Sequence, residues 1–316
     1  MLDLIDLTKS YRIKEKGILR PKYRLVTALN GVSLSISNTN TLAILGPNGS
    51  GKSTLCKIAA GMIKPTSGEA LLNGIDLTEN VRRLSKEIGV VLGPALVYHR
   101  QTGYKYLRFF AKIYGVTQYD KRINELSKMM NLEKWLNTHI ESYSLGMKIK
   151  ISLARCLLHD PHFLVLDEFT MGLDPLAAKE IRRFIKGMRK TTLLTTHNTL
   201  EAEMMSHKVA LISGGNLIVS DTLGNLFKPL KKKLKLVVAL KDVSEAKKAL
   251  AGDHAISFLE NTKGDLEIVA RDQEISGILK ILSQHKVTSM YTTAPTLEDA
   301  YAHFTGELLD EKAKVV

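Results

Sequence analysis

Two stretches near the start of the chain, 2–7 and 29–36, alternate apolar and polar residues, which predicts two half-buried strands. Further strands are expected at four places, 41–45, 88–92, 163–166 and 192–195. A helix is expected over 177–188, between the last two of these strands. This alternation of strands and helices predicts an α/β fold with a mainly parallel sheet that is covered on both faces.

Between residues 104 and 158 the apolar pattern takes a helical period. Two sets of apolar residues recur there at helical spacing, Leu107, Phe110, Ala111 and Tyr114, and then Met147, Ile151, Ala154 and Leu158. No strand is evident in this part of the sequence. The pattern therefore predicts a helical subdomain at about 94–158, inserted into an α/β domain that covers 1–225. A hairpin at 209–220 is expected near the end of that domain.

The lysine run at 231–233 marks the start of a different unit. Its pattern predicts the order strand, helix, strand, strand, helix, strand, with the strands at 234–240, 255–260, 266–270 and 287–292. That order is the one of a ferredoxin-like α+β domain, which we expect at 231–305, with a charged tail at 306–316. No catalytic cluster is evident there, so a structural or regulatory role is expected.

The composition is ordinary for a globular protein, with 316 residues of which 44% are hydrophobic and 24% charged. The longest nearly uncharged apolar run, 88–98, is too short for a membrane span, which takes about 20 residues. The first residues lack a basic stretch followed by an apolar one, so no signal peptide is expected. Cys56 and Cys156 fall on predicted helices, and we expect both to be small buried thiols.

The net charge of +13 lies in the first 230 residues, because the acidic and basic side chains of 231–316 cancel. Part of the excess is a basic cluster opposed by Glu15 alone, made of Arg12, Lys14, Lys16, Arg20, Lys22 and Arg24. Such a cluster could contact anionic lipid head groups, a protein partner or nucleic acid, and a solvated loop is the plainer alternative. No groove-reading motif accompanies it, so no specific nucleic-acid partner is expected.

Residues 46–54 carry the most specific motif of the chain. They read Gly46-Pro47-Asn48-Gly49-Ser50-Gly51-Lys52-Ser53-Thr54 and match the phosphate-binding P-loop pattern, between a predicted strand and a predicted helix start. Glycines there let backbone amides approach phosphate oxygens, and the helix N-terminus adds positive potential. Lys52 would reach the outer phosphates of a nucleotide, and Ser53 would offer its hydroxyl to Mg²⁺. A glycine-rich turn without a ligand is the alternative, and the match at every position disfavours it.

Two carboxylates and a histidine follow the ends of neighbouring predicted strands. Asp167 and Glu168 come directly after an apolar run, and His197 follows the next strand along the chain. Strand ends are where a doubly wound sheet presents side chains to a ligand. Asp167 would bind Mg²⁺, directly or through water, while Glu168 would polarise the attacking water. His197 could hydrogen-bond the terminal phosphate or that water; the alternatives are solvated carboxylates and a structural histidine.

Together these stretches resemble the ATP-binding-cassette (ABC) ATPases over about residues 2–225. Residues 143–147, with Ser144 and Gly146, resemble the signature motif of that family in its exporter-type form, and 172–175 resemble its D-loop. His197 matches the switch histidine, and Tyr11 falls where an aromatic ring stacks on adenine. Residues 295–300 resemble, less specifically, the C-terminal extension of exporter ATPases.

The resemblance implies a P-loop NTPase fold with a mixed sheet, ATP and Mg²⁺ as cofactors, and an ATPase with Glu168 and His197 as catalytic residues. It also implies that two copies sandwich two ATP molecules, so that Ser144 and Gly146 of one copy cap the γ-phosphate held by the other. Closure of this dimer on ATP would drive separate transmembrane subunits of an exporter, with this chain peripheral on the cytoplasmic face of the membrane. The transported substrate cannot be read from the sequence.

The sequence departs from the family pattern at a few positions. Gly93 stands where the family usually has a glutamine that contacts Mg²⁺ and the attacking water, and Gln101 lies eight residues further on. Leu145 replaces a small residue of the signature, and Phe169 replaces a common proline. Two alternatives remain at this point: a soluble ABC-type ATPase that acts on the ribosome or DNA, and a weakly catalytic, regulatory ATP-binding module.

Overall fold

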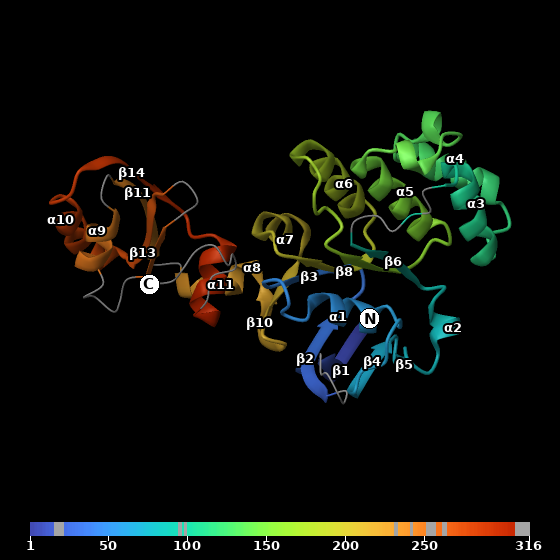
Figure 1. Ribbon diagram of the computed structural model, residues 1–316, viewed down its shortest axis with the longest axis horizontal. Helices are drawn as coiled ribbons and strands as arrows, with labels where there is room; N and C mark the ends of the chain where they lie inside the picture. Colours follow the sequence, from blue (N-terminus) through green and yellow to red (C-terminus); the bar gives the residue numbers. More distant parts are fainter. Residues whose placement is uncertain are drawn as a thin grey trace. The chain divides into compact units, whose positions relative to one another are not determined.

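The computed structural model describes residues 1–15, 22–93, 97, 100–230, 233–240, 243–250, 257–260 and 264–306. Contacts divide the chain into two compact units, Met1–Ser220 and Asp221–Val316, which are described separately (Figure 1). The domain ranges expected from the sequence, 1–225 and 231–305, remain predictions. Of the expected tail at 306–316, Gly306 alone lies within the described residues.

A six-stranded sheet forms the centre of the first unit. Its strand order is β10-β9-β3-β8-β7-β6, with the strands β3 (Thr41–Leu45), β6 (Ile88–Leu92), β7 (Phe163–Asp167), β8 (Thr191–Thr196), β9 (Lys208–Ser213) and β10 (Asn216–Thr222). The five strands from β9 to β6 in this order run parallel. Every residue of β7 and β8 is buried, so the predicted parallel sheet is confirmed.

A second, four-stranded sheet was not expected. It has the order β2-β1-β4-β5 and consists of β1 (Leu2–Glu15), β2 (Lys22–Ile36), β4 (Ser67–Leu72) and β5 (Ile75–Asp76). All its pairings are antiparallel. The alternative of a solvated loop for the basic cluster therefore does not hold for the residues that the structure describes between 12 and 24. β1 and β2 continue through Arg12, Lys14 and Arg24, because a ribbon with both faces exposed needs no apolar alternation.

Basic side chains on this ribbon are placed by cross-strand neighbours. Arg12 lies opposite Leu25, and its guanidinium stands 4.0 Å from the centre of the Tyr23 ring. Such a cation–π contact stabilises a paired strand as an apolar contact does. Lys16 and Arg20 of the basic cluster lie outside the described residues.

One helix joins the two sheets. The helix α1 (Lys52–Ala59) buries Leu55, Ile58 and Ala59 in a core that also holds residues of β1, β3 and β7 (Figure 1). The parallel sheet is thus covered on this side, as expected, and α1 and the antiparallel sheet share the cover. The other face lies toward α5 (Leu145–Leu157), α6 (Pro175–Gly187) and α7 (Thr199–Met205) (Figure 1).

The middle of the chain is helical, as predicted. It contains α3 (Gly103–Ile113), α4 (Tyr119–Met129) and α5, joined by the 3-10 turns η1 (Glu133–Trp135) and η2 (Ile140–Ser142). A short helix, α2 (Val81–Leu84), precedes β6. Cys56 on α1 and Cys156 on α5 are both buried and free, which confirms the expected buried thiols.

The second unit has the predicted ferredoxin-like order. It consists of α8 (Leu223–Leu226), η3 (Lys228–Leu230), β11 (Lys233–Leu240), α9 (Val243–Leu250), β12 (Ser257–Glu260), β13 (Leu266–Arg271), η4 (Asp272–Glu274), α10 (Ile275–Leu282), β14 (Val287–Thr293) and α11 (Leu297–Thr305). Its sheet has the order β12-β13-β11-β14 with every pairing antiparallel. Side chains of β11 and β13 form the core with α9 and α10.

None of the helices in the described ranges combines the length and the apolarity that crossing a membrane requires.

Candidate functional site

The P-loop lies where β3 ends and α1 begins, and its glycines are required by close backbone contacts. A Cβ atom on Gly46 would come within 2.2 Å of the Ile212 carbonyl oxygen. Gly51 has a φ of +104°, and a Cβ there would lie 2.3 Å from the Ala28 carbonyl oxygen. Neither distance is tolerable for a carbon atom, so these two positions accept glycine alone.

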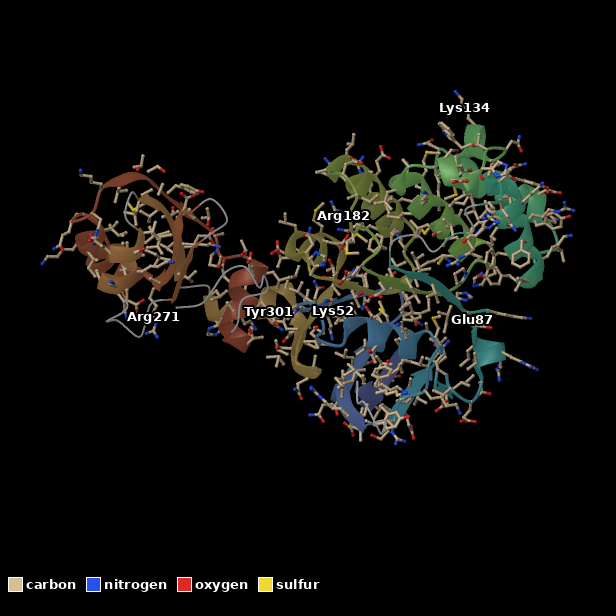
Figure 2. All side chains as sticks on the ribbon, viewed as in Figure 1. Lys52, Glu87, Lys134, Arg182, Arg271 and Tyr301 are labelled. Carbon is tan, nitrogen blue, oxygen red and sulfur yellow. The ribbon has the colours of Figure 1, made fainter. Side chains whose placement is uncertain are left out.

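Lys52 is held inside this loop with its ammonium group facing backbone oxygens. Its Nζ donates hydrogen bonds to the carbonyls of Gly46 at 2.8 Å and Pro47 at 2.9 Å. The side chain is 4% exposed, and its Nζ lies 3.5 Å from Oε1 of Glu168. Burial lowers the pKa of Lys52, and the Glu168 carboxylate opposes that shift in part. Figure 2 shows Lys52 in the interior of the first unit, where α1 starts.

The two strand-end carboxylates are placed differently. Asp167 is the last residue of β7, is 7% exposed, and accepts a hydrogen bond from Ser53 Oγ at 3.1 Å. Glu168 leaves the strand with a φ of +44°, a conformation that non-glycine residues adopt at some cost and often at functional sites. Its Oε1 lies 3.6 Å from Nδ1 of His197, whose side chain is about half exposed. The structure therefore brings Lys52 and His197 to the same carboxylate oxygen, Oε1 of Glu168.

Thr195 is a site residue that the sequence interpretation missed. It lies opposite Asp167 in the register of β7 and β8, and its hydroxyl donates a hydrogen bond to Asp167 Oδ1. The backbone amide of Glu168 donates to the Thr195 carbonyl at 3.1 Å. Thr195 thus holds the carboxylate of Asp167 and the backbone of Glu168, and its position two residues before His197 was the signal that could have indicated it.

A pocket of about 270 Å³ opens over the P-loop. It is lined by Ala28, Asn48, Gly49, Gly51, Lys52, Ser53, Thr54 and Glu168. Ala28 comes from β2 and was also missed by the sequence interpretation. It contributes only backbone atoms and a methyl group to the pocket wall, and these carry no chemical signal in a sequence. Ser50 is not part of this lining, and its buried hydroxyl has no hydrogen-bond partner among the described residues.

Tyr11 lies on β1 beside the start of α1. Its hydroxyl is 3.4 Å from Oγ1 of Thr54, which lines the pocket. The ammonium group of Lys9 stands 5.4 Å from the centre of the Tyr11 ring. The predicted aromatic residue is therefore adjacent to the P-loop helix, although it is not part of the pocket wall.

Ser144 and Gly146 do not join the pocket within one chain, since the lining comes from 28, 48–54 and 168. Ser144 caps α5, and its Oγ accepts a hydrogen bond from the amide of Met147 at 3.2 Å. A Cβ on Gly146 would contact Ala177 of α6 at 3.6 Å. In the isolated chain the signature stretch thus begins a helix away from the P-loop.

Gly93 directly follows β6, beside the end of β7 that carries Asp167. Its φ is +57°, and its amide donates to the Asp167 carbonyl at 2.8 Å. A glutamine in this left-handed conformation would be strained, which explains why glycine suits the position. The residues 94–96, where the family pattern continues, lie outside the described residues.

Comparison with known proteins shows which family the chain belongs to. The profile of the family described as ABC transporter matches residues 29–171. The uncharacterized ABC transporter ATP-binding protein YhcH of Bacillus subtilis (strain 168) is 30% identical over 318 residues, which cover 98% of each chain. The chain belongs to the ABC transporter ATP-binding protein family. It binds ATP and is an ATPase of the ABC type.

Two further matches extend the comparison. The fluoroquinolones export ATP-binding protein MT2762 of Mycobacterium tuberculosis (strain CDC 1551 / Oshkosh) is 28% identical and covers 89% of each chain. A dimeric, post-hydrolysis structure of the ATP-binding cassette MJ0796 with ADP and Pi superposes with a TM-score of 0.63 at 24% identity. It covers 71% of this chain and 99% of its own, which confirms the cassette fold.

Proposed function

We propose that this ABC ATPase powers an exporter, acting as a dimer beneath separate transmembrane subunits. The observation that carries the proposal is the Glu168 carboxylate, which has the Lys52 ammonium at 3.5 Å and the His197 imidazole at 3.6 Å. A carboxylate beside a phosphate-binding lysine can accept a proton from a water aimed at the terminal phosphate. We assign Glu168 the role of base and His197 that of a hydrogen-bond donor to the same water or phosphate.

The remaining P-loop groups fit the binding of a nucleotide. The amides of the 46–54 turn and the start of α1 supply positive potential for the phosphates. Lys52 adds the positive charge of its ammonium group, which Glu168 compensates only in part. Tyr11, next to Thr54, is assigned to stack on adenine. Hydrolysis is expected to take place where this phosphate cradle meets Glu168.

Ser53 and Asp167 are the residues proposed to hold Mg²⁺. Their oxygens already lie 3.1 Å apart, and Mg²⁺ prefers such oxygen donors together with waters and phosphate oxygens. The hydroxyl and the buried carboxylate therefore fit the ion. When bound, Mg²⁺ would neutralise developing charge on the phosphates.

Dimerisation on ATP is proposed to complete each site. Within one chain Ser144 and Gly146 are not among the residues that line the pocket, while the helix α5 that Ser144 caps offers its positive end to a ligand. We assign this end of α5 to the γ-phosphate bound by the second copy. The dimeric state named for the matched cassette supports the assignment.

Export, and a peripheral place on the cytoplasmic face of the membrane, are proposed from relatives that span most of the chain. The mycobacterial relative is named as an export protein and is matched over 89% of both chains. An ATPase of this family that carries no membrane-crossing helix in its described part needs partner subunits to move a substrate. The alternative of an ATPase acting on the ribosome or DNA is not favoured by these names.

The decisive test is Glu168→Gln, which removes the proton acceptor and keeps the shape of the side chain. We expect steady-state ATP hydrolysis to fall by about 10² or more, because a transition-state contact of this kind contributes several kcal/mol. ATP should then trap a dimer that size-exclusion chromatography with light scattering detects. The matched control is Glu133→Gln, an exposed glutamate of η1. Phosphate release by Glu168→Gln at the wild-type rate would contradict the assignment.

A weakly catalytic regulatory module is the second candidate, and Gly93 is the observation that favours it. The family glutamine that would contact Mg²⁺ and the attacking water is replaced by a glycine in a left-handed turn. ATPase assays with and without the membrane subunits separate the two functions. An exporter ATPase should be stimulated by those subunits, whereas a regulatory module should stay slow in both assays.

A further inference from the structure

The strand β14 forms one edge of the sheet in the second unit. Within the described residues it is paired with β11 and with no other strand. The strand has seven residues; those from Val287 to Thr292 are exposed, and Thr293 is half-buried. Alternate backbone N–H and C=O groups of an edge strand point away from the sheet and are available to another strand.

β14 lacks the features that usually protect an edge. It contains no charged residue and no proline, and it is rich in threonine and other residues that favour strands. The opposite edge, β12, has four residues, and the edge strand β10 of the first unit carries Asp221. The one irregularity of β14 lies near Val287, so residues 289–293 pair in regular register with β11.

At this edge a large apolar side chain is exposed on each face of the sheet. Met290 lies opposite Val238, whose side chain packs in the core with α9 and α10, yet Met290 is 45% exposed. Tyr291 lies opposite Val237 on the other face and is 55% exposed. A strand added alongside β14 would cover both side chains at once.

We propose that β14 pairs antiparallel with β14 of a second copy, across a two-fold axis at Tyr291, and joins the two sheets into one of eight strands. In the regular segment 289–293 this register sets Tyr291 against Tyr291 of the second copy, and Met290 against Thr292 of the second copy. A strand that meets itself brings every charge near its own like charge, and 287–293 carries none. The strand is thus self-complementary in charge and in β propensity.

This pairing goes beyond the proposed ATP-dependent closure, because it involves no residue of the nucleotide site. It would keep the two copies associated while the ATP sites are empty. The matched dimeric cassette covers 71% of this chain and 99% of its own length, so the contact belongs to a part of the chain beyond that cassette. Association held in this way would raise the effective concentration of one cassette for the other.

The test is disulfide trapping of Tyr291→Cys in the full chain, without nucleotide. Directly opposed residues of antiparallel strands have Cα atoms about 4.5–5.5 Å apart, which suits a disulfide. The native thiols Cys56 and Cys156 are buried, so they give little background. We expect mild oxidation to yield covalent dimer at least tenfold faster than in the control Leu279→Cys, an exposed position on α10.

Equal cross-linking rates for the two variants would overturn the proposal, and would mean that β14 serves another partner or none. Tyr291→Lys provides the second measurement, since it sets two ammonium groups against each other at the axis. Sedimentation should then show less nucleotide-free dimer, while Tyr291→Lys combined with Glu168→Gln should still dimerise with ATP. Loss of the ATP dimer in Glu168→Gln alone would count against the proposed function, and it would leave the cross-linking result standing.

Discussion

Among the residues whose burial the structure describes, each unit has one buried lysine, and the groups around the two lysines differ. Lys52 of the P-loop is 4% exposed and Lys235 of β11 is 6% exposed. Lys52 donates to two backbone carbonyls, and its Nζ forms an ion pair with Glu168 at 3.5 Å. Lys235 lies 2.7 Å from Glu267 and 3.0 Å from Asp299, so two carboxylates surround it.

The pKa values of the two ammonium groups move in opposite directions. Burial lowers the pKa of both, because removal from water penalises the charged form. For Lys52 burial prevails and the pKa falls. For Lys235 the hydrogen bonds and charges of Glu267 and Asp299 outweigh burial, and the pKa rises. A partly compensated lysine is suited to an anionic ligand, whereas a fully compensated one ties elements of the fold together.

The largest effect is expected from Lys235→Met, which leaves two carboxylates facing an apolar side chain. Removing one member of a buried ion pair typically costs about 3–5 kcal/mol. The free energy of unfolding of the second unit should fall by about that amount, as measured by hydrogen exchange of the β13 amides in urea. Arg271→Met, at an exposed ion pair with Glu274, is the control and should change it by less than about 1 kcal/mol. Equal effects would show that Lys235 is not a structural tie.

Lys52→Met should show the reverse pattern. We expect ATP hydrolysis to fall by about 10² or more, since the charge for the outer phosphates is lost. The hydrogen exchange of β13 in the second unit should stay unchanged. Lys64→Met removes an exposed lysine paired with Glu79 in the same unit and should leave ATP hydrolysis near the wild-type rate. A stability loss without an activity loss in Lys52→Met would remove the contrast between the two lysines.

Thr195→Val should have a smaller effect on the site. The substitution removes the hydroxyl that donates to Asp167. Among the described residues, Ser53 is then the remaining side-chain donor to that carboxylate. Losing a hydrogen bond to a charged group costs about 1.5–3 kcal/mol, so the Mg²⁺ concentration for half-maximal ATPase should rise roughly tenfold or more. Thr192→Val, a buried threonine earlier on β8, is the control for the fold. If both variants needed the same Mg²⁺ concentration, Thr195 would have no part in positioning Asp167.

The smallest effect is expected from alkaline pH. Lys235 has a raised folded-state pKa, so its stabilising effect is complete below the unfolded value of about 10.4 and is lost as pH rises through the folded value. Lys52 has a lowered folded-state pKa, so its burial costs stability at low pH, and this cost shrinks as pH rises from the folded value toward the unfolded value of about 10.4. Hydrogen exchange corrected for pH should therefore show the second unit weakening above about pH 10.4 in the wild type, and weakening less in Lys235→Met. Identical pH dependence in the two proteins would contradict the raised pKa.

Much of the fold followed from local pattern, and the exceptions have one cause. The parallel strands, the helical middle and the ferredoxin-like order are carried by apolar periods that each segment shows by itself. The antiparallel sheet and the long β1–β2 ribbon could not be derived in that way. Arg12 and Arg24 interrupt the apolar alternation, and they are accommodated because their strands pair with both faces exposed.

The candidate site shows the same division. Residues 46–54 and the pair Asp167 and Glu168 were recognisable because phosphate and metal chemistry demands particular residues at short, fixed spacing. Thr195 has only its place two residues before His197 as a signal, which is weak because a threonine near a strand end is common. Its contact with Asp167 exists because β7 and β8 lie side by side.

The sequence by itself determined the local conformations and the phosphate-binding chemistry, because both depend on residues a few positions apart. The tertiary structure alone decided which distant groups meet. The Ser53–Asp167 bond joins positions 114 residues apart, and the buried Lys235–Asp299 pair joins positions 64 residues apart. Such contacts depend on the order and register in which strands assemble, and no local period records that order.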